Sequence, residues 1–454
     1  PHLNVQLNFG AGRALLPERI ELFVTTGTDD GTDLPPAVVA ALGRPGGEDD
    51  AAVAAVLWAH ASRHAVELAP RRVELANLEE RLASLTEPFS TMVMAVADKP
   101  RETRILHRGD YAQPTEVVTP GTPAFLPPPP PGAAEDRLGL AQWVVMPGHP
   151  LTARVAVNRF WRLLFGTGLV ATPADFGTQG EFPSHPELLD WLALDFVASG
   201  WDVKRLLTLL ATSETYRQSA AATPEQLERD PRNRLLARGP RFRLGAEFIR
   251  DHALRVSGLL VPRIGGPSVN PYLPYDLWRE VSHYGSTPAT AQVFVQDRGE
   301  KLYRRSLYTY WKRTAPPPSL AAFDAPNREV CTIERGANTT PLQALVLLND
   351  VQFVEAARAF AERALRHPES ADDARLRWLF AEGVSRPPAA AELAVLRGAL
   401  TRERARYARD PAAAAAFLSA GESPRDADLP APEHAAWAQV ATLVLNLSEA
   451  ITRN

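Results

Sequence analysis

The chain has a single cysteine, Cys331, among its 454 residues. One thiol excludes an intrachain disulfide, a zinc site built from several thiolates, and covalent haem attachment through a Cys-x-x-Cys-His motif. Apolar runs are short, and none approaches the ~20 residues that a membrane helix requires, so we expect no membrane span. The formal net charge is −4, which provides no overall basic field and disfavours nucleic-acid binding.

Lysine is also scarce: of the 49 basic residues, 4 are lysine and 45 are arginine. The codon bias of a GC-rich genome produces such a ratio without any functional cause. Arginine is also the side chain that binds carboxylates, sulfates and phosphates through two parallel hydrogen bonds. Both explanations can hold together, so the arginines remain candidates for anion recognition.

The length and the 45% hydrophobic content are typical of a soluble globular protein with about two or three domains. Alternating residues in 1–28 predict the C-terminal strands of a truncated β-sandwich, because two strands rarely fold alone. This start also indicates that the chain is a fragment. Residues 29–98 have helical spacing. Residues 99–136 indicate an extended, Pro-rich linker that ends in five prolines, Pro127 to Pro131.

Residues 137–454 are predicted to form an α-helical domain. Caps and apolar spacing mark several of its helices: 151–165 followed by Gly166, one opened by Ser184, one opened by Thr340, and 433–451. Residues 302–311 alternate like a short strand. The predicted fold class is therefore mainly α: a helical domain with a small β element, preceded by the tail of a truncated β-sandwich.

Long ordered segments of this domain carry a family resemblance. They include HPLTARVAVNRFWRLLFGTGLVATPADFG, DPRNRLLARGPRFRLGAEFIRDHALRVSGLL, YRRSLYTYWKRTAPPPSLAAFDAPNREVC and NTTPLQALVLLNDVQFVEAARAFAERAL. Residues 137–454 resemble, nearly end to end, the planctomycete family called domain of unknown function 1553. That family has no established catalytic residues, so none is carried over to this chain.

The resemblance implies an extracytoplasmic parent protein, periplasmic or secreted. Family members often carry a cytochrome c domain and a concanavalin-like β-sandwich, and their genes lie among polysaccharide-degradation and sulfatase genes. For this chain the resemblance implies no cofactor, because no haem motif is present. Haem c is expected in the missing N-terminal part of the parent protein.

Four residues are candidates for acid/base chemistry. Glu247 and Asp251 stand four apart on one helix face and repel each other unless a cation lies between them. Asp324 lies in a rigid Asp-Ala-Pro turn, and His185 stands at a helix N-terminus, where a neutral imidazole is favoured. The alternatives are an internal ion-pair network for the two carboxylates and a capping position for the histidine.

Candidate substrate-binding residues follow from shared faces and from a helix N-terminus. They are Arg154, Asn158, Arg304, Arg305, Tyr308, Arg328, Asn338 and Thr339. Arginine beside tyrosine suits a sugar that bears an anionic group, and the residues before Thr340 lie where free N–H groups attract anions. For Arg154 and Asn158 the alternative is a polar face that hydrogen-bonds the following loop. No metal site is predicted.

Two functions stay open. The first is an extracytoplasmic carbohydrate-associated protein, with or without enzyme activity, that takes an anionic polysaccharide (sulfated or uronic) in an Arg/Asp-rich pocket. The second is a non-catalytic scaffold that docks a cytochrome c domain or partner enzymes. An enzyme requires Arg and Asp side chains that converge in an open pocket without satisfying each other. A scaffold pairs each carboxylate with arginine and leaves no such cleft.

Overall fold

The computed structural model describes residues 35–42, 51–64, 68–86, 92–95, 101–274, 277–281 and 291–453. The strands predicted within 1–28 lie outside the described residues. The chain divides into two compact units, Pro1–Thr115 and Glu116–Asn454.

The described part of the first unit is mostly helical. Its helices are α1 (Pro36–Leu42), α2 (Ala51–His64) and α3 (Ala69–Thr86), all within the segment predicted to be helical. β1 (Thr103–Leu106), the turn η3 (His107–Gly109) and β2 (Pro114–Val118) follow, and the two strands form a small sheet.

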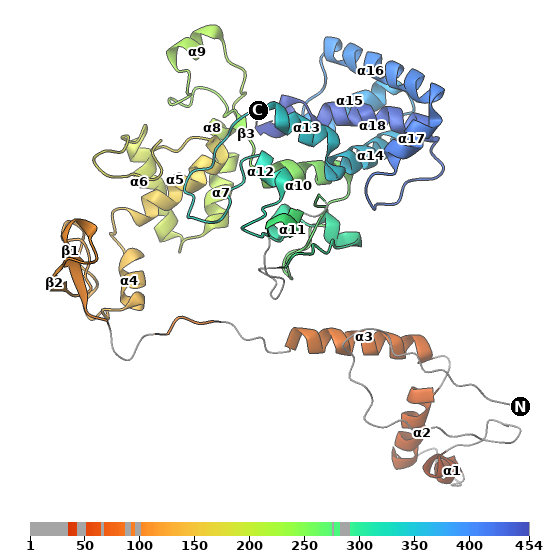
Figure 1. Cartoon of the computed structure of the whole chain (residues 1–454), viewed down its shortest axis with the longest axis horizontal. Coiled ribbons are helices and arrows are strands. Elements are labelled where there is room, and N and C mark those ends of the chain that lie inside the picture. Colours follow the sequence, from red (N-terminus) through yellow and green to blue (C-terminus); the bar gives the residue numbers. More distant parts are fainter. Residues whose placement is uncertain are drawn as a thin grey trace, which may run out of the picture. The chain divides into compact units, whose positions relative to one another are not determined.

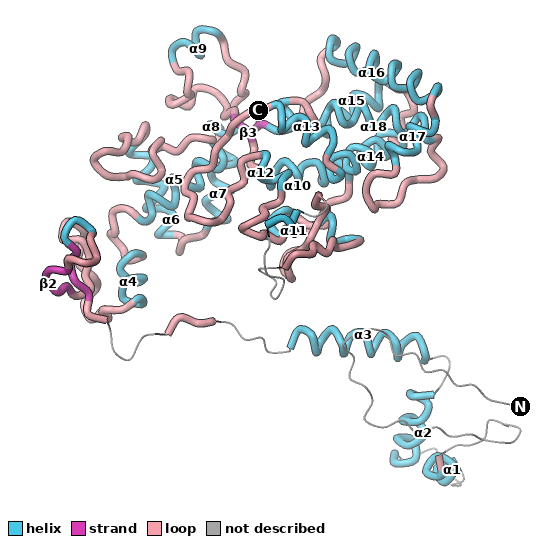
Figure 2. Tube along the Cα trace, viewed as in Figure 1, coloured by secondary structure: helices cyan, strands magenta, loops and turns pink. Residues whose placement is uncertain are grey.

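The second unit is built mainly from helices (Figures 1 and 2). In chain order these are α4 (Arg137–Val144), α5 (Thr152–Phe165), α6 (Pro186–Ala198), α7 (Val203–Thr212), α8 (Glu214–Arg217), α9 (Pro224–Arg229), α10 (Ala246–Ser257), α11 (Leu277–Val281), α12 (Pro318–Ala322), α13 (Pro341–Asn349), α14 (Val351–Leu365), α15 (Asp372–Val384), α16 (Ala390–Arg409), α17 (Pro411–Leu418), α18 (Ala431–Leu445) and α19 (Ser448–Ile451). β3 (Phe242–Arg243) pairs antiparallel with β4 (Thr452–Arg453). With 54% helix and 5% strand, the predicted fold class is confirmed.

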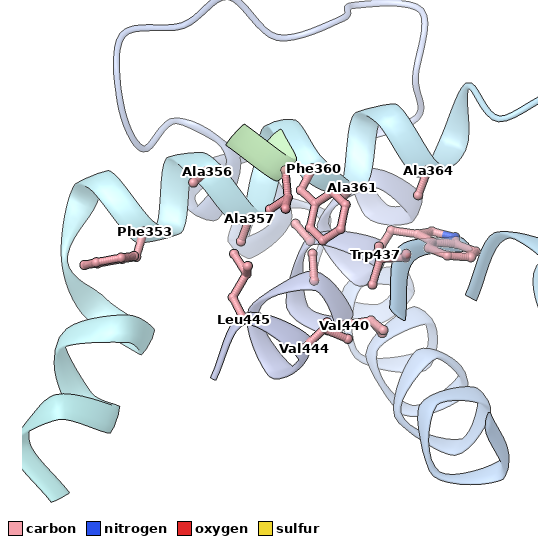
Figure 3. Packing of buried hydrophobic residues seen from close by; sticks show 14 of the residues in the cluster. Phe353, Ala356, Ala357, Phe360, Ala361, Ala364, Trp437, Val440, Val444 and Leu445 are labelled. Carbon is pink, nitrogen blue, oxygen red and sulfur yellow. The ribbon is translucent and has the colours of Figure 1, made fainter. Parts of the chain in front are cut away.

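The main core lies where α14 packs against α18, as Figure 3 shows. Ala357 and Ala361 of α14 are fully buried, and these small side chains let the two helices approach closely. Phe360 of α14 and Trp437 of α18 fill the space beside them. Residues of α10, α15, α16 and α17 complete this cluster.

A smaller core joins α5, α6 and α7. Val157, Trp161 and Phe165 of α5 are buried against Leu192 and Phe196 of α6. Trp161 stacks on Phe165 with ring centroids 4.0 Å apart. Because these positions follow helical spacing, one face of α5 is apolar and turns inward.

The strand predicted at 302–311 is wrong. The segment forms two 3-10 turns, η5 (Gly299–Tyr303) and η6 (Ser306–Tyr308), with single bridges such as Arg304 to Val261. The alternating exposure of its side chains survives, since Arg304 is buried and Arg305 is exposed.

Arg250 explains why this segment does not form a strand. Its guanidinium donates to the carbonyls of Leu302 at 2.7 Å and Arg304 at 2.9 Å. Those carbonyls would otherwise accept ladder hydrogen bonds from a neighbouring strand. The small β element of this unit therefore lies at β3 and β4.

Candidate functional site

Two of the predicted carboxylates form ion pairs with arginines of distant segments. Glu247, at the start of α10, lies 2.6 Å from Arg335. Asp324 pairs with Arg243 of β3 and also accepts a hydrogen bond from the backbone N–H of Asn338 at 3.1 Å. Both acids therefore hold the exposed segment 327–340 against the rest of the unit.

The third carboxylate, Asp251, accepts hydrogen bonds from the turn η6. Its Oδ1 accepts hydrogen bonds from the backbone N–H and the hydroxyl of Ser306, each at 2.7 Å. The neighbouring Arg250 side chain is only 3% exposed. Burial lowers the pKa of Arg250 to about 10, opposed by the nearby charges of Asp251 and Asp350. This set orders the interior around η6.

His185 is the N-cap residue of α6, and Pro186 occupies the first helical position. The sequence placed the cap one residue earlier, at Ser184. Ser184 instead donates its backbone N–H to the carbonyl of Leu169 at 2.9 Å, so it ties the preceding loop to the end of α5. The His185 Nδ1 lies 3.0 Å from the Ser184 hydroxyl.

Arg154 and Asn158 of α5 bond other parts of the protein, as the alternative of a polar face that hydrogen-bonds a neighbouring loop predicts. Asn158 is fully buried, donates to the carbonyl of Val170 at 2.9 Å and accepts from the Val170 N–H at 3.0 Å. Arg154 pairs with Asp190 of α6 at 2.6 Å and donates to the carbonyl of Pro150. Both side chains thus bond neighbouring segments of the same unit.

Arg304 and Tyr308 hold a loop. Arg304 is buried and donates to the carbonyls of Arg263 at 3.0 Å and Gly265 at 2.5 Å. Its guanidinium lies 3.8 Å from the Tyr308 ring centre, and the Tyr308 hydroxyl accepts from the Gly265 N–H at 2.7 Å. The predicted arginine–tyrosine pair exists, but its acceptors are neutral backbone carbonyls instead of an anion.

The remaining predicted residues are exposed. Arg328 stacks on the ring of Trp311, with its guanidinium carbon 4.4 Å from the ring centre, while Arg305 and Thr339 face solvent. Asn338 turns its side chain to Asp324. None of the twelve predicted residues lines the groove described below.

A groove of about 730 Å³ opens in the second unit. Buried Trp161 and Phe165 of α5 line it together with Phe242 and the segments 166–171 and 220–241. Its arginines are Arg232, Arg234, Arg238 and Arg241, and we call it the arginine groove. Ligand sites are typically clefts of ~300–1,000 Å³, so this one is of ordinary size for a ligand.

The arginine groove carries more positive than negative charge. Arg234 pairs with Glu181 at 3.0 Å, and Glu181 is the one carboxylate that lines the groove. Arg232 and Arg241 make no hydrogen bond, ion pair or ring contact with any described residue. Three arginines therefore remain without a carboxylate partner in the groove, and two of them have no partner of any kind among the described residues.

Arg238 is the buried member of this set, with 9% of its surface exposed. Its Nη2 donates to the carbonyls of Asp230 at 2.8 Å and Pro231 at 3.1 Å. Asn233 clamps the Arg238 backbone by accepting from its N–H and donating to its carbonyl. The Arg238 Nη1 has no hydrogen-bond partner. A buried charged donor left without a partner is uncommon and calls for an explanation.

The wall of the groove is an excursion of the chain over residues 219–239, which contains α9 (Figure 1). Its ends meet where the Gly239 N–H donates to the Ser219 carbonyl at 2.8 Å. Gly239 is required because a Cβ there would lie 2.3 Å from the Gln218 carbonyl oxygen. Within the excursion, burial opposes ionisation of Asp230, but backbone hydrogen bonds from Leu235 and Arg234 lower its pKa.

Sequence reasoning did not single out these four arginines. The signal was available as their density, since ten residues from 232 to 241 hold four arginines. The density of arginines does not show which guanidinium groups have partners, because those partners are carbonyls and carboxylates of other segments.

Within the part of the chain that the structure describes, no three His, Cys, Asp or Glu side chains gather closely enough to hold a metal ion. Among the same residues, every helix is too short or too polar to cross a membrane.

The arginine groove and the main core both lie largely within a region that is shared with other proteins. Residues 136–400 match the family described as "Protein of unknown function (DUF1553)". No curated protein and no solved structure matches the chain. Because the match covers more than half of the 454 residues, the family resemblance is confirmed, and the chain belongs to the DUF1553 family of proteins of unknown function.

Proposed function

We propose that this chain binds an anionic polysaccharide, sulfated or uronic, in the arginine groove, as an extracytoplasmic carbohydrate-associated protein. One observation carries the proposal: four arginines and a single carboxylate line a groove of about 730 Å³. Guanidinium groups bind sulfate and carboxylate oxygens in a fixed fork. The periplasmic or secreted location comes from the family resemblance.

Aromatic side chains make the groove suitable for a sugar as well as for an anion. Trp161, Phe165 and Phe242 line it beside the arginines. Trp161 and Phe165 are buried in the smaller core, so the partly exposed Phe242 is the ring that a sugar can contact. A sugar ring presents apolar C–H groups on one face and hydroxyl groups at its edge, so it can contact aromatic carbon while its anionic substituent reaches arginine. A bare anion site needs no such aromatic lining.

Binding is supported better than carboxylate-catalysed hydrolysis. Most glycosidases use two carboxyl groups about 5–10 Å apart, and the groove is lined by Glu181 alone, which pairs with Arg234. The predicted acids Glu247 and Asp324 pair with arginines outside the groove. We therefore place the role of this chain in recognition.

The scaffold remains the second candidate. The internal pairing of Glu247 and Asp324 is what a rigid docking domain requires. In this alternative the chain is non-catalytic and docks partner enzymes or a cytochrome c domain of the parent chain, which would hold haem c. The two functions are compatible, because one unit can bind a glycan and hold a neighbour.

The test is binding of dextran sulfate, polygalacturonate and neutral dextran to the whole chain, measured by calorimetry at two salt concentrations. Removing both partnerless arginines, Arg232→Gln with Arg241→Gln, should weaken binding of the anionic polymers by about tenfold or more, since charge-assisted hydrogen bonds contribute about 1.5–3 kcal/mol each. Neutral dextran should not bind.

The matched control is Arg402→Gln with Arg409→Gln on α16, which removes the same charge from exposed arginines outside the groove. Binding should change less than about twofold, because distant surface charges are screened. Equal weakening in both double variants would mean that only net charge matters. If neither dextran sulfate nor polygalacturonate binds, the proposal is rejected.

A further inference from the structure

Arg238 differs from the other arginines that have an unpartnered buried nitrogen. In Arg243, Arg304, Arg358 and Arg375 that atom is Nε, which carries one N–H beside the aliphatic stem. In Arg238 it is Nη1, a terminal nitrogen with two N–H groups. Of these five described arginines, only Arg238 lines the arginine groove.

The position of Arg238 is fixed before any ligand arrives. Its Nη2 is held by two backbone carbonyls, and Asn233 bonds its backbone on both sides. The guanidinium is planar, so fixing Nη2 also fixes the direction of the Nη1 N–H groups. A donor held in this way loses little freedom when it binds an acceptor.

Building on the proposed function, we propose that Arg238 forms a recessed subsite for a pendant monoanionic group of the glycan, a sulfate ester or a carboxylate. An oxygen of that group accepts from Nη1, and Arg241 at the exposed rim neutralises the remaining charge. Because Nη1 is recessed, the anion must stand at the end of a short stalk. The in-chain phosphate of a phosphodiester carries a substituent on both sides and does not reach it.

The first test changes only the ligand. Glucose 6-sulfate and glucuronate represent the two pendant anions, and dimethyl phosphate represents a diester of the same single charge. Calorimetry with the whole chain should give binding of at least one pendant anion that is at least tenfold tighter than that of dimethyl phosphate. The pair of sugars also shows which pendant anion is preferred. Equal affinity for the diester overturns the subsite.

The second test changes the protein. Arg238→Lys keeps the charge but loses the planar fork, and should weaken the preferred sugar at least tenfold, after circular dichroism shows that the helices are retained. Arg402→Gln, at an exposed position of α16 outside the groove, is the matched control and should weaken it less than about twofold. If Arg232→Gln causes a larger loss than Arg238→Lys, the anion binds at the rim and the subsite is rejected.

The failure of this inference is separable from the failure of the proposed function. If polysaccharide binding is lost in the Arg232/Arg241 double variant but unchanged in Arg238→Lys, the proposed function is supported and the subsite is rejected. If the small sugar anions bind and require Arg238, but neither polymer binds, the subsite is supported and polysaccharide binding is rejected. Nitrogen-15 signals of the Arg238 side chain give an independent readout, because an acceptor at Nη1 shifts them.

Discussion

The main core and the arginine groove use the same kinds of residue in opposite ways. In the core, Glu355 and Arg358 of α14 have side chains that are only 1% and 2% exposed. Glu355 accepts from the Tyr303 hydroxyl at 2.8 Å and the Ser423 N–H at 2.6 Å, while Arg358 donates to the Ser423 carbonyl. In the groove, Arg238 is also buried, but its unpartnered nitrogen is the terminal Nη1 with two N–H groups, whereas that of Arg358 is Nε with one.

The comparison separates the arginines by how many of their donors have partners, a property that their number in the sequence does not give. A buried charge with internal partners stabilises one arrangement of the chain, and removing a partner is costly. An exposed charge without partners, such as Arg232 or Arg241, contributes little to folding and is available to a ligand. A buried donor without a partner costs free energy until an acceptor satisfies it.

The largest effect is expected for Glu355→Ala, which leaves Arg358 buried without a counter-charge. We expect a loss of about 3–5 kcal/mol in the free energy of unfolding, measured by urea denaturation. Glu403→Ala, which removes a pair with Arg406 at the surface of α16, should cost at most about 1 kcal/mol. Similar losses in the two variants would erase the contrast.

Asn158→Ala should follow, with a loss of about 2–3 kcal/mol. The change leaves the Val170 N–H and carbonyl without partners in a buried place. The control is Asn349→Ala, because the Asn349 amide bonds only the Leu345 carbonyl at an exposed position of α13. A loss at Asn158 no larger than at Asn349 would show that the segment after α5 is held by something else.

The third prediction concerns alkaline pH. Burial, together with the hydrogen bond and the charge of Glu355, raises the pKa of Tyr303 to about 12. The unfolded phenol has a pKa of ~10, so the stability contributed by neutral Tyr303 is complete below about pH 10. It is lost as the pH rises through 12.

Unfolding midpoints measured between about pH 9 and pH 12 should therefore fall more steeply in the native chain than in Tyr303→Phe. Tyrosinate absorbance in the folded state gives the titration directly. If the two chains have parallel pH profiles, Tyr303 ionises as it does in the unfolded chain, and its contact with Glu355 is not formed.

The smallest effect is expected in the groove. Arg232→Gln and Arg241→Gln should each change the free energy of unfolding by less than about 0.5 kcal/mol, as is usual at surface positions without special contacts. Chemical denaturation of the same double variant used for ligand binding checks this. A loss above about 1 kcal/mol would mean that these arginines stabilise the folded state, as the paired charges of the main core do.

Helix ends were predictable because their signals are local. Gly166 ends α5 as its C-cap, and Pro341 opens α13 at the first helical position, both as expected. The Gln343 side chain accepts from the Thr340 N–H, which is one half of the predicted capping box. Such signals lie within four residues of each other, so one sequence contains them completely.

Features that depend on distant partners could not be predicted. The segment 302–311 has the alternation of a strand, and Arg250, more than fifty positions away, determines that it turns instead. In the same way, the sequence shows arginines at 232–241 but not that Arg238 keeps a free donor, because its partners are set by how the chain returns on itself.

The excursion 219–239 has a consequence for how this family can diversify. Its two ends meet at one backbone hydrogen bond between Gly239 and Ser219, so the chain enters and leaves the groove wall at the same place. The entropy of closing such a loop grows only slowly with its length. Insertions or exchanges there can reshape the groove wall while α5 and α10 keep their positions, so the lining of the groove can change separately from the fold.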